Sequence, residues 1–279
     1  MKNFFKLIRV KHYVKNCLVF LPMFFGGVFF EKERTINAIL GFIAFSTLSS
    51  VVYIINDIKD IEKDRKHETK KNRPLASGAI SIGTAIVIAV VLIALTILCS
   101  FFIRNYVAII CLLVYLLINI FYSMGLKNKP IIDVVLLASG FVIRVFYGGA
   151  VTGVPISKWL YLVIVTGSLY MGLGKRRNEL KTQTDTREVL KYYNEAFLDK
   201  NMYVCIALVN VFYALWSIEM PNPRMIWTVP AFVILLMKYS LDVEGNSDGD
   251  PVEVIFRDKV LIGLVLLYAL CVFLLVYIL

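Results

Sequence analysis

The sequence predicts an all-α integral membrane protein built from nine transmembrane helices. Of its 279 residues, 59% are hydrophobic and the mean hydropathy is +0.74, well above the range of soluble domains. Apolar stretches of membrane-spanning length recur from one end of the chain to the other. A soluble protein of this length would need an implausibly large hydrophobic core. We therefore expect one polytopic membrane domain, residues 1–279.

Nine apolar segments are expected to form the spans. Several of them are short, so tilted or partial spans fit them best. The segments are 17–30, 38–55, 81–103, 106–124, 131–151, 158–174, 202–220, 225–241 and 260–279.

The distribution of basic residues predicts the orientation in the cell membrane. Alternate connections, counted from the N-terminus, carry 24 Lys and Arg residues, the opposite set carries five, and Arg144 lies inside a span. By the positive-inside rule the N-terminus is cytoplasmic. An odd number of spans then leaves the C-terminus external. This topology also explains the net charge of +10, and no nucleic-acid-binding motif surrounds the basic residues, so we expect no nucleic-acid partner.

Acidic residues are concentrated in the same cytoplasmic loops, which the positive-inside rule does not explain. In residues 53–78, YIINDIKDIEKDRKHETKKNRPLASG, an asparagine and three aspartates begin as the chain leaves the bilayer. On one helix, Asn56, Asp57, Asp60 and Asp64 fall within an arc of roughly 100° and can face one cavity. Clustered carboxylates repel unless a cation lies between them, and these oxygen ligands suit Mg²⁺.

Three basic residues follow at once and supply donors for phosphate groups: Lys70, Lys71 and Arg73. The alternative is a solvated loop of mixed charge. That alternative does not explain why Asn56 and Asp57 lie where the chain has not yet left the membrane. Polar side chains are energetically costly there and usually have a function.

The pattern N-D-x-x-D-x-x-x-D followed by K-x-R-P-L-A-S-G resembles the first signature of the UbiA-type membrane prenyltransferase superfamily. The resemblance implies a nine-helix bundle. It also implies an active-site cavity that opens to the cytoplasm, where Mg²⁺ bridges Asp-rich motifs to a diphosphate. The span count obtained from hydropathy agrees with this fold.

The second cytoplasmic motif differs from that of typical members. Where the superfamily carries D-x-x-x-D, this chain has YMGLGKRRNELKTQ, with Lys175, Arg176, Arg177 and Glu179. Lys175 and Glu179 can pair at i,i+4, which leaves an arginine to hold a phosphate. The alternative is ordinary positive-inside anchoring. A donor with a diphosphate at one end and a phosphate at the other, such as 5-phosphoribosyl 1-diphosphate, fits these charges.

Further segments resemble the decaprenyl-phosphate phosphoribosyltransferase branch of that superfamily. They lie along nearly the whole chain: RVKHYVKNCLVF, GKRRNEL, YSMGLKNKPIIDVVLLASGFVIRVFYGGAVTGVPISKW and KYSLDVEGNSDGDPVEVIFRDKVL. The branch implies Mg²⁺-dependent transfer of 5-phosphoribose to a polyprenyl phosphate, with release of diphosphate. No feature of the sequence specifies the polyprenyl chain length or an oligomeric state.

Other polar residues are candidates for substrate binding. Asp133 and Arg144 are eleven residues apart and share a helix face at different depths. Asp133 would meet metal or ribose. Arg144 would meet a lipid phosphate, help to close the bundle or form an interhelical pair.

A second group of candidates lies at the predicted cytoplasmic ends of spans: Lys15, Asn16, Tyr122, Ser123 and Lys127. Lys15 and Tyr122 fit equally well as interfacial anchors. Four acidic residues of the last cytoplasmic loop either bind metal or cap the last helix: Asp248, Asp250, Glu253 and Asp258. Gly148 and Gly149 are expected to allow close helix packing or a turn.

Two other functions compete with phosphoribosyl transfer. A prenyltransferase would move an isoprenoid from its diphosphate to an aromatic or other acceptor, and the missing second Asp pair disfavours it. A transporter would place its site near the bilayer midplane, between broken helices. Here the dense polar motifs lie at one surface.

Overall fold

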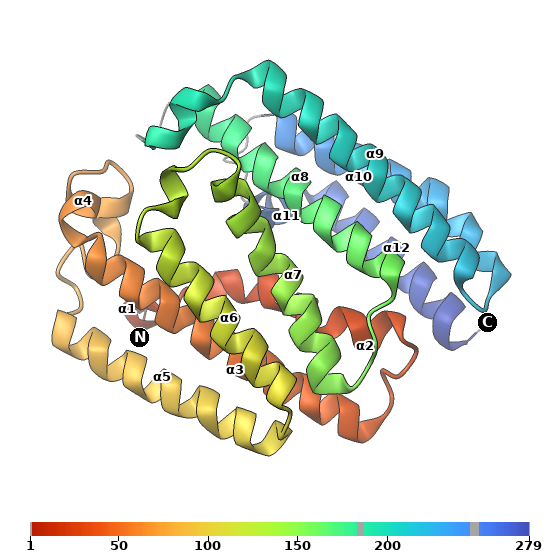
Figure 1. Cartoon of the computed structure of the whole chain (residues 1–279), viewed down its shortest axis with the longest axis horizontal. Coiled ribbons are helices and arrows are strands. Elements are labelled where there is room, and N and C mark those ends of the chain that lie inside the picture. Colours follow the sequence, from red (N-terminus) through yellow and green to blue (C-terminus); the bar gives the residue numbers. More distant parts are fainter. Residues whose placement is uncertain (1, 183–186, 246–250, 279) are drawn as a thin grey trace. The chain divides into compact units, whose positions relative to one another are not determined.

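The computed structural model describes residues 2–182, 187–245 and 251–278, and in these ranges every regular element is a helix (Figure 1). The chain divides into two compact units. Unit 1 contains Met1–Met23, Val28–Ser123 and Arg144–Val154, and unit 2 contains Phe24–Gly27, Met124–Ile143 and Pro155–Leu279.

Unit 1 is built around one long central helix. Its elements are α1 (Lys2–Leu7), the 3₁₀ helix η1 (Val10–Phe20), most of α2 (Leu21–Phe25), α3 (Lys32–Lys59), α4 (Ile61–Arg65), the 3₁₀ turn η2 (Lys70–Asn72), α5 (Ile82–Ile103), α6 (Tyr106–Ser123) and the second half of α7 (Ile132–Thr152). The central helix is α3: 67% of its apolar segment is buried, against 22% for α5 and 17% for α6.

Small and hydroxylated residues let α3 pack closely against its neighbours in unit 1. A Cβ on Gly41 would lie 3.0 Å from the Val151 side chain of α7. The hydroxyls of Thr47 and Thr96 are 2.8 Å apart and join α3 to α5, which lie side by side in Figure 1. Such contacts replace the hydrophobic driving force that is weak between helices in lipid.

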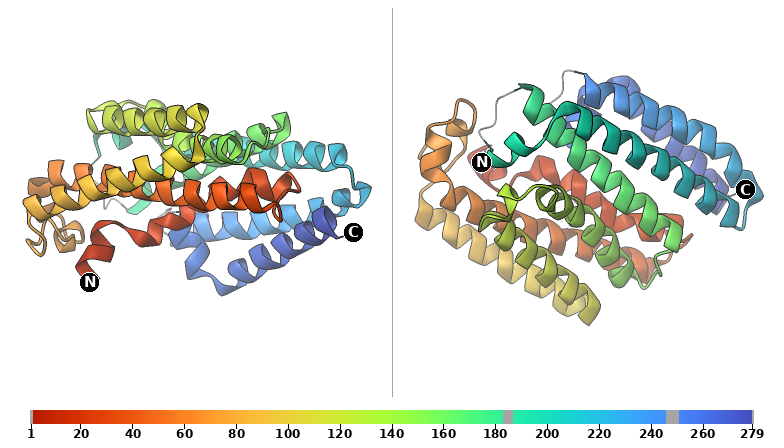
Figure 2. Two further views of the ribbon diagram at one scale, coloured as in Figure 1. Left: turned by 90° about the horizontal axis from the view of Figure 1, so that it is seen from below. Right: turned by 45° about the horizontal axis from the view of Figure 1, so that its top comes forward.

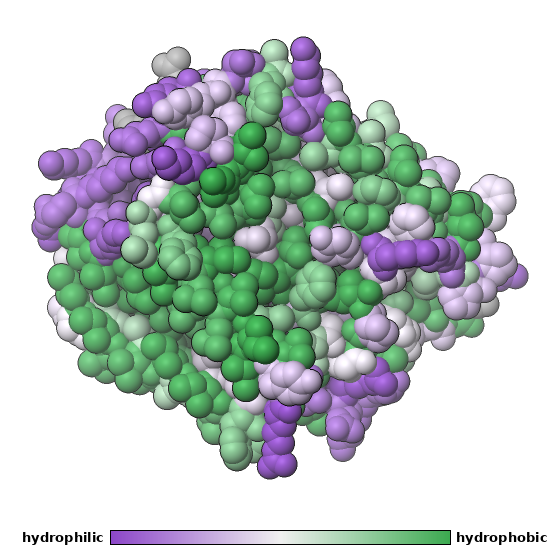
Figure 3. Space-filling model, in the orientation of Figure 1, coloured by the Kyte–Doolittle hydropathy of each residue, from purple (hydrophilic) through white to green (hydrophobic). Residues whose placement is uncertain are grey.

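The outward faces of α5 and α6 are almost wholly apolar. Figure 3 shows them as a continuous hydrophobic surface, with hydrophilic residues gathered around α4 and the loop that follows it. Exposed apolar side chains in this number are expected where a helix faces acyl chains. The two helices are joined by a turn at Asn105, which caps α6 through the Ala108 N–H and donates to the Ala150 carbonyl at 2.8 Å.

The first expected span, 17–30, is not one regular helix. The 3₁₀ helix η1 is followed by α2, of five residues, and by a turn at Gly27, whose φ is +71°. Pro22 lacks an N–H and is tolerated only in the first turn of a helix, where α2 places it. The Asn16 side chain, just before this segment, donates hydrogen bonds to the hydroxyls of Ser46 and Ser49 in α3. The first expected segment is thus irregular and is made of part of a 3₁₀ helix and a short α-helix.

Unit 2 contains the remaining helices. They are the 3₁₀ turn η3 (Leu126–Asn128), the first half of α7, α8 (Lys158–Thr182), the 3₁₀ turn η4 (Glu188–Tyr192), α9 (Glu195–Glu219), the 3₁₀ turn η5 (Pro223–Trp227), α10 (Thr228–Glu244), α11 (Pro251–Arg257) and α12 (Lys259–Tyr277). The long helices α8 and α9 run side by side in both Figure 1 and Figure 2.

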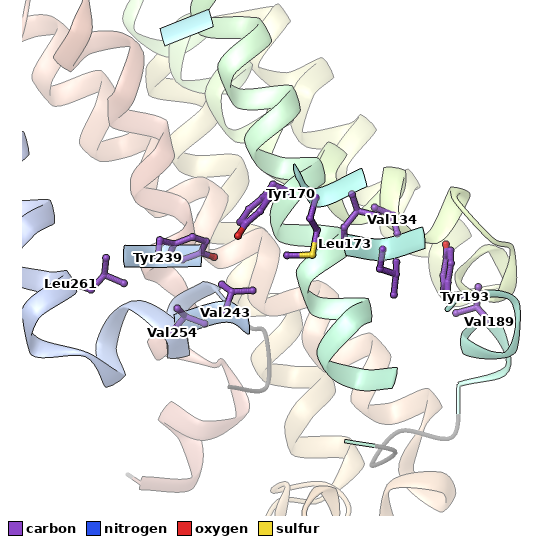
Figure 4. Close-up of a cluster of buried hydrophobic side chains, with 11 residues drawn as sticks. Val134, Tyr170, Leu173, Val189, Tyr193, Tyr239, Val243, Val254 and Leu261 are labelled. Carbon is purple, nitrogen blue, oxygen red and sulfur yellow. The ribbon is translucent and has the colours of Figure 1, made fainter. Parts of the chain in front are cut away.

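One hydrophobic cluster joins the elements of unit 2. Figure 4 shows Tyr170 and Leu173 of α8 with Tyr239 and Val243 of α10, among other buried side chains of the cluster. Gly174 permits this packing, since a Cβ there would lie 2.9 Å from the Val243 side chain.

Seven helices in the described part of the chain are long and apolar enough to cross a membrane: α3, α5, α6, α7, α9, α10 with its preceding turn η5, and α12. The protein is therefore a multi-pass membrane protein. The expected total of nine is not confirmed by length and composition. The two other expected spans are the irregular first segment and 158–174, where α8 continues through the charged residues KRRNELKT.

Gly148 supports the expectation of close helix packing. A Cβ at Gly148 would lie 2.1 Å from the backbone oxygen of Val19 in unit 1, closer than any contact can be. Only glycine leaves room for η1 at this point of α7.

The Gly148→Ala variant should therefore lose about 1–3 kcal/mol of unfolding free energy through overpacking. Thermal unfolding of the purified protein in detergent measures this loss. Gly263→Ala in α12 is the control, because no described atom lies within 4 Å of the added methyl group. Equal melting temperatures for the two variants would contradict the close contact.

Candidate functional site

The acidic stretch of unit 1 spans two helices instead of one. Asp60, with φ −98° and ψ 9°, separates α3 from α4. Hydrogen bonds nevertheless continue through the break, from the Asp60 N–H to the Asn56 carbonyl and from the Asp64 N–H to the Asp60 carbonyl. Asn and Asp side chains compete with helical backbone bonds, which favours a break in this stretch. The expected single helical arc is thus wrong in detail.

Asp57 and Asp64 are brought together by one arginine. Arg73 Nη1 lies 3.2 Å from Asp57 Oδ1 and 2.7 Å from Asp64 Oδ2. Both aspartates are almost fully buried, with 3% and 4% of their surface exposed. Two carboxylate oxygens therefore converge on one guanidinium nitrogen.

A second arginine, which the sequence prediction did not include, contacts the same carboxylate. Arg9 Nη2 lies 2.5 Å from Asp57 Oδ1, and its guanidinium lies over the Tyr53 ring, 4.5 Å from the centroid. Its only sequence signal is its place at the start of RVKHYVKNCLVF. Asp57 thus carries two guanidinium contacts on one oxygen.

Asn56 and Ser123 meet beside this pair in unit 1. The Ser123 hydroxyl donates to Asn56 Oδ1 at 2.5 Å, and Lys59 Nζ donates to the Ser123 carbonyl at 2.7 Å. Asp60 is half-buried. Within the described ranges, no three Asp, Glu, His or Cys side chains come close enough together to hold a metal ion. Asp57 and Asp64 are the two expected carboxylates that share one cation partner, Arg73.

This pair fits a divalent cation. Mg²⁺ in proteins is commonly held by one or two carboxylates, with water and substrate phosphates completing its shell. Two carboxylate oxygens already lie within bonding distance of one nitrogen, so a small ion between them needs little rearrangement. All the donors are hard oxygen atoms, which suit Mg²⁺ better than softer metals.

The loop after α4 contains the three basic residues that the sequence predicts to bind phosphate, and one of them contacts the buried carboxylates. Arg73 contacts the carboxylates, whereas Lys71 is exposed and Lys70 is half-buried. The loop is anchored by buried Leu75 and by a hydrogen bond from Arg65 Nε to the Ala76 carbonyl. These two contacts hold the loop in place.

Arg144 closes the interior of unit 1. Its Nε donates to Asn16 Oδ1 at 2.7 Å, and its guanidinium lies over the rings of Phe45 and Tyr115. Asn16 in turn donates to the Ser46 hydroxyl of α3. These contacts join η1, α3, α6 and α7, in agreement with the bundle-closing alternative for Arg144. The neighbouring Lys15 and the residue Tyr122 of α6 are both half-buried.

In unit 2 the second motif lies on the helix α8, not in a loop, and Arg176 is wholly enclosed. Arg176 Nε lies 2.5 Å from Asp133 Oδ2, and its Nη1 lies 2.5 Å from Glu179 Oε2. Both Arg176 and Asp133 are 0% exposed. Arg187 also approaches Glu179, at 3.6 Å. In this structure Arg176 pairs with two carboxylates, and its side chain has no exposed surface that a phosphate could contact.

Tyr193 completes this buried network. Its hydroxyl donates to Asp133 Oδ1 at 2.6 Å and accepts from the Ile131 N–H at 2.6 Å. Burial and the bond to Asp133 raise the pKa of Tyr193 to about 12, so the phenol keeps its proton at neutral pH. Ile131 has a φ of +67°, which a β-branched residue rarely adopts, and Tyr193 holds it there.

Arg177 differs from its neighbour. Its Nε donates to Asp199 Oδ1, but its Nη1 is buried and has no hydrogen-bond partner among the described residues. A buried donor without a partner is costly and points to a missing ligand or water. Lys175 is half-buried on the same helix, and Lys127 lies in η3.

Asp258 caps the last helix. Its Oδ1 accepts from the N–H groups of Val260 and Leu261, and its Oδ2 pairs with Lys238. The bond from Lys238, together with these backbone N–H groups, lowers the pKa of Asp258. The structure thus favours capping over metal binding for Asp258. Asp248 and Asp250 lie outside the described residues.

Known proteins with similar sequences cover nearly the whole chain. A decaprenyl-phosphate phosphoribosyltransferase of Corynebacterium glutamicum is 35% identical over 286 residues, which cover 98% of this chain and 86% of that protein. A decaprenyl-phosphate phosphoribosyltransferase of Mycobacterium tuberculosis is 33% identical over 267 residues, covering 92% of this chain and 88% of that protein.

The fold is shared with a solved structure. A UbiA homologue from Archaeoglobus fulgidus, bound to DMAPP and Mg²⁺, superposes with a TM-score of 0.75 at 18% identity, covering 97% of this chain and 99% of that one. Residues 19–257 match the UbiA prenyltransferase family. The resemblance expected from the Asp-rich motif is confirmed, and the chain belongs to the UbiA prenyltransferase family.

Proposed function

We propose that this protein transfers 5-phosphoribose from 5-phosphoribosyl 1-diphosphate to a polyprenyl phosphate and releases diphosphate. The observation that carries the proposal is the buried Asp57–Asp64 pair, which shares one cation position beside a loop rich in phosphate-binding residues. The names of the relatives, at 35% and 33% identity, indicate the donor and the acceptor.

Asp57 and Asp64 are the proposed metal ligands, and Asn56 and Asp60 orient water around the ion. A bound Mg²⁺ would neutralise charge on the diphosphate and make it a better leaving group. The Mg²⁺ in the Archaeoglobus homologue supports this assignment. Arg73 leaves the carboxylates and joins Lys70 and Lys71 in binding diphosphate oxygens.

The reaction exchanges one C–O bond at ribose C1 for another. An oxygen of the lipid phosphate attacks C1 while the bond to the diphosphate breaks and its electron pair leaves with the diphosphate. The lipid phosphate is anionic near neutral pH, so it needs no strong general base. In-line attack inverts C1 and converts an α-linked donor into a β-linked product.

The lipid phosphate has its own candidates in unit 1. Lys15, Asn16, Tyr122 and Ser123 are proposed to bind or orient it, and Arg144 fixes Asn16. Tyr122 and Ser123 lie at the end of α6, and Lys15 and Asn16 lie within η1. A polyprenyl tail would follow the apolar surface of those helices.

In unit 2 the phosphate-binding role is proposed for Arg177, with Lys175 and Lys127. Arg177 keeps a buried guanidinium nitrogen without a partner in the described chain, whereas Arg176 uses its donors on Asp133 and Glu179. Asp133, Arg176 and Glu179 are therefore proposed as positioning residues and not as groups that touch substrate.

We also propose the finer topology from the sequence. The seven apolar helices, α8 and the irregular first segment together give nine spans. The excess of Lys and Arg in alternate connections puts the N-terminus and the active site on the cytoplasmic side and the C-terminus outside. Residues 1–279 would act as one transferase domain.

The proposed reaction predicts ribose in a lipid extract. Purified protein with Mg²⁺ and a polyprenyl phosphate should convert labelled 5-phosphoribosyl 1-diphosphate into an organic-soluble product and release one diphosphate per ribose transferred. A parallel reaction contains a prenyl diphosphate and aromatic acceptors. Prenyl transfer without ribose transfer would overturn the proposal.

Variants of the carboxylate pair accompany that assay. Asp57→Asn and Asp64→Asn should each lower kcat at least about 10³-fold, because each removes a charge that holds the metal. Glu62→Gln is the matched control, since Glu62 is exposed and pairs only with Arg65 in the described chain. Full activity in both aspartate variants would remove the metal assignment.

The two neighbouring arginines should behave differently. Arg176→Gln leaves Asp133 and Glu179 buried without their counter-charge and should cost about 3–5 kcal/mol of unfolding free energy. Arg177→Gln should instead raise the KM for 5-phosphoribosyl 1-diphosphate about tenfold, with a much smaller change in stability. Thermal unfolding and initial rates separate the two effects. A large KM change in a fully stable Arg176→Gln protein would reverse the assignment.

A further inference from the structure

Arg9 lies outside the sequence signature of the site, yet it makes one of the two cationic contacts to Asp57. Its Nη2 is 2.5 Å from Asp57 Oδ1, the oxygen that Arg73 Nη1 also approaches, at 3.2 Å. A carboxylate that is 3% exposed needs such a counter-charge to remain ionised. Arg9 itself is 21% exposed, so solvent and solutes can reach it.

The backbone that precedes Arg9 is anchored in unit 1. Leu7 and Ile8 are buried in a hydrophobic cluster with Ile54 of α3, and the Ser50 hydroxyl donates to the Ile8 carbonyl at 2.8 Å. Arg9 is held in the left-handed region, with φ 53° and ψ 49°, which residues other than glycine adopt rarely. Such a conformation persists when the surrounding packing determines it. The side chain can therefore change partners while its backbone stays in place.

Tyr53 gives the guanidinium a second, weaker attachment. The Arg9 guanidinium carbon lies 4.5 Å from the centroid of the Tyr53 ring. Tyr53 precedes Asp57 by four residues on α3, so ring and carboxylate lie on one face of that helix. The ring therefore helps to hold the guanidinium at Asp57.

We infer that Arg9 is an exchangeable counter-ion, which leaves Asp57 for the donor's diphosphate when the metal ion enters and so couples metal binding to donor binding. The inference rests on the proposed role of Asp57 as a metal ligand.

Electrostatics gives the coupling its direction. A divalent ion that approaches Asp57 alone meets a guanidinium already on the same oxygen, and the like charges oppose its binding. An ion that arrives with a diphosphate brings an anion that the planar guanidinium can bind through two N–H groups. Metal without donor should therefore bind weakly, and metal with donor should bind tightly.

The test measures metal binding directly by Mn²⁺ electron paramagnetic resonance on the purified full-length protein. The wild type should bind Mn²⁺ weakly alone and much more tightly when 5-phosphoribosyl 1-diphosphate is present. Arg9→Gln should bind Mn²⁺ alone about tenfold more tightly than the wild type and should lose most of the gain from the donor. Arg9→Lys keeps the charge and should stay close to the wild type.

Lys11→Gln is the matched control, because it removes an exposed positive charge two residues away and should leave both affinities unchanged. If Arg9→Gln fails to fold, Tyr53→Leu removes the stacking partner and should shift donor-free Mn²⁺ affinity in the same direction, by less. If Arg9→Gln binds Mn²⁺ without donor no more tightly than the wild type does, Arg9 is not an exchangeable counter-ion. That result would not affect the proposed metal site. Absence of Mn²⁺ from the wild type, even with donor, overturns the metal site itself.

Discussion

The constraint on which the site in unit 1 depends is the burial of two carboxylates where a membrane helix ends. Moving an ionised carboxylate out of water without a partner costs several kcal/mol. Asp57 and Asp64 are both buried, and their charges are offset by Arg73 and, at Asp57, by Arg9. The fixed loop after α4 and the anchored backbone before η1 bring these two arginines to the carboxylates. A cation at this position is thus a requirement of the fold as well as of the proposed chemistry.

The two units meet the same physical requirement in different ways. In unit 2, Arg176 and Asp133 are both 0% exposed, and Tyr193 adds a further bond to Asp133. Removing any one of these three side chains leaves a buried charge or hydrogen-bond donor without its partner. In unit 1, Arg9 and Arg73 are 21% and 30% exposed, so each guanidinium can find another anion. The cations of the first cluster are thus fully enclosed, whereas those of the second are partly exposed to solvent.

Much of the fold could be predicted from the sequence because lipid imposes long apolar helices. Eight of the nine expected segments overlap long helices of the structure, and the Asp-rich motif identified the family. Hydropathy did not reveal that the first segment is divided between η1 and α2. The break at Asp60 also escaped prediction, since helical periodicity does not register a single residue that leaves the helix.

The residues of the site were harder to predict than its location. Asp57, Asp64 and Arg73 share a short segment, so their spacing revealed them. Arg9 is 48 residues from Asp57, and only the fold brings it there. Arg176 and Arg177 are neighbours of equal charge in the sequence. Their contacts distinguish them, because Arg176 pairs with two carboxylates, whereas Arg177 Nη1 has no hydrogen-bond partner among the described residues.

The most direct measurement is the anomalous scattering of Mn²⁺ in crystals grown with 5-phosphoribosyl 1-diphosphate. A shared cation position predicts a Mn²⁺ peak between the Asp57 and Asp64 carboxylates, with the donor diphosphate on the ion and both guanidinium groups moved onto phosphate oxygens. A Mn²⁺ peak elsewhere, with Arg9 and Arg73 still on the two carboxylates, would contradict it.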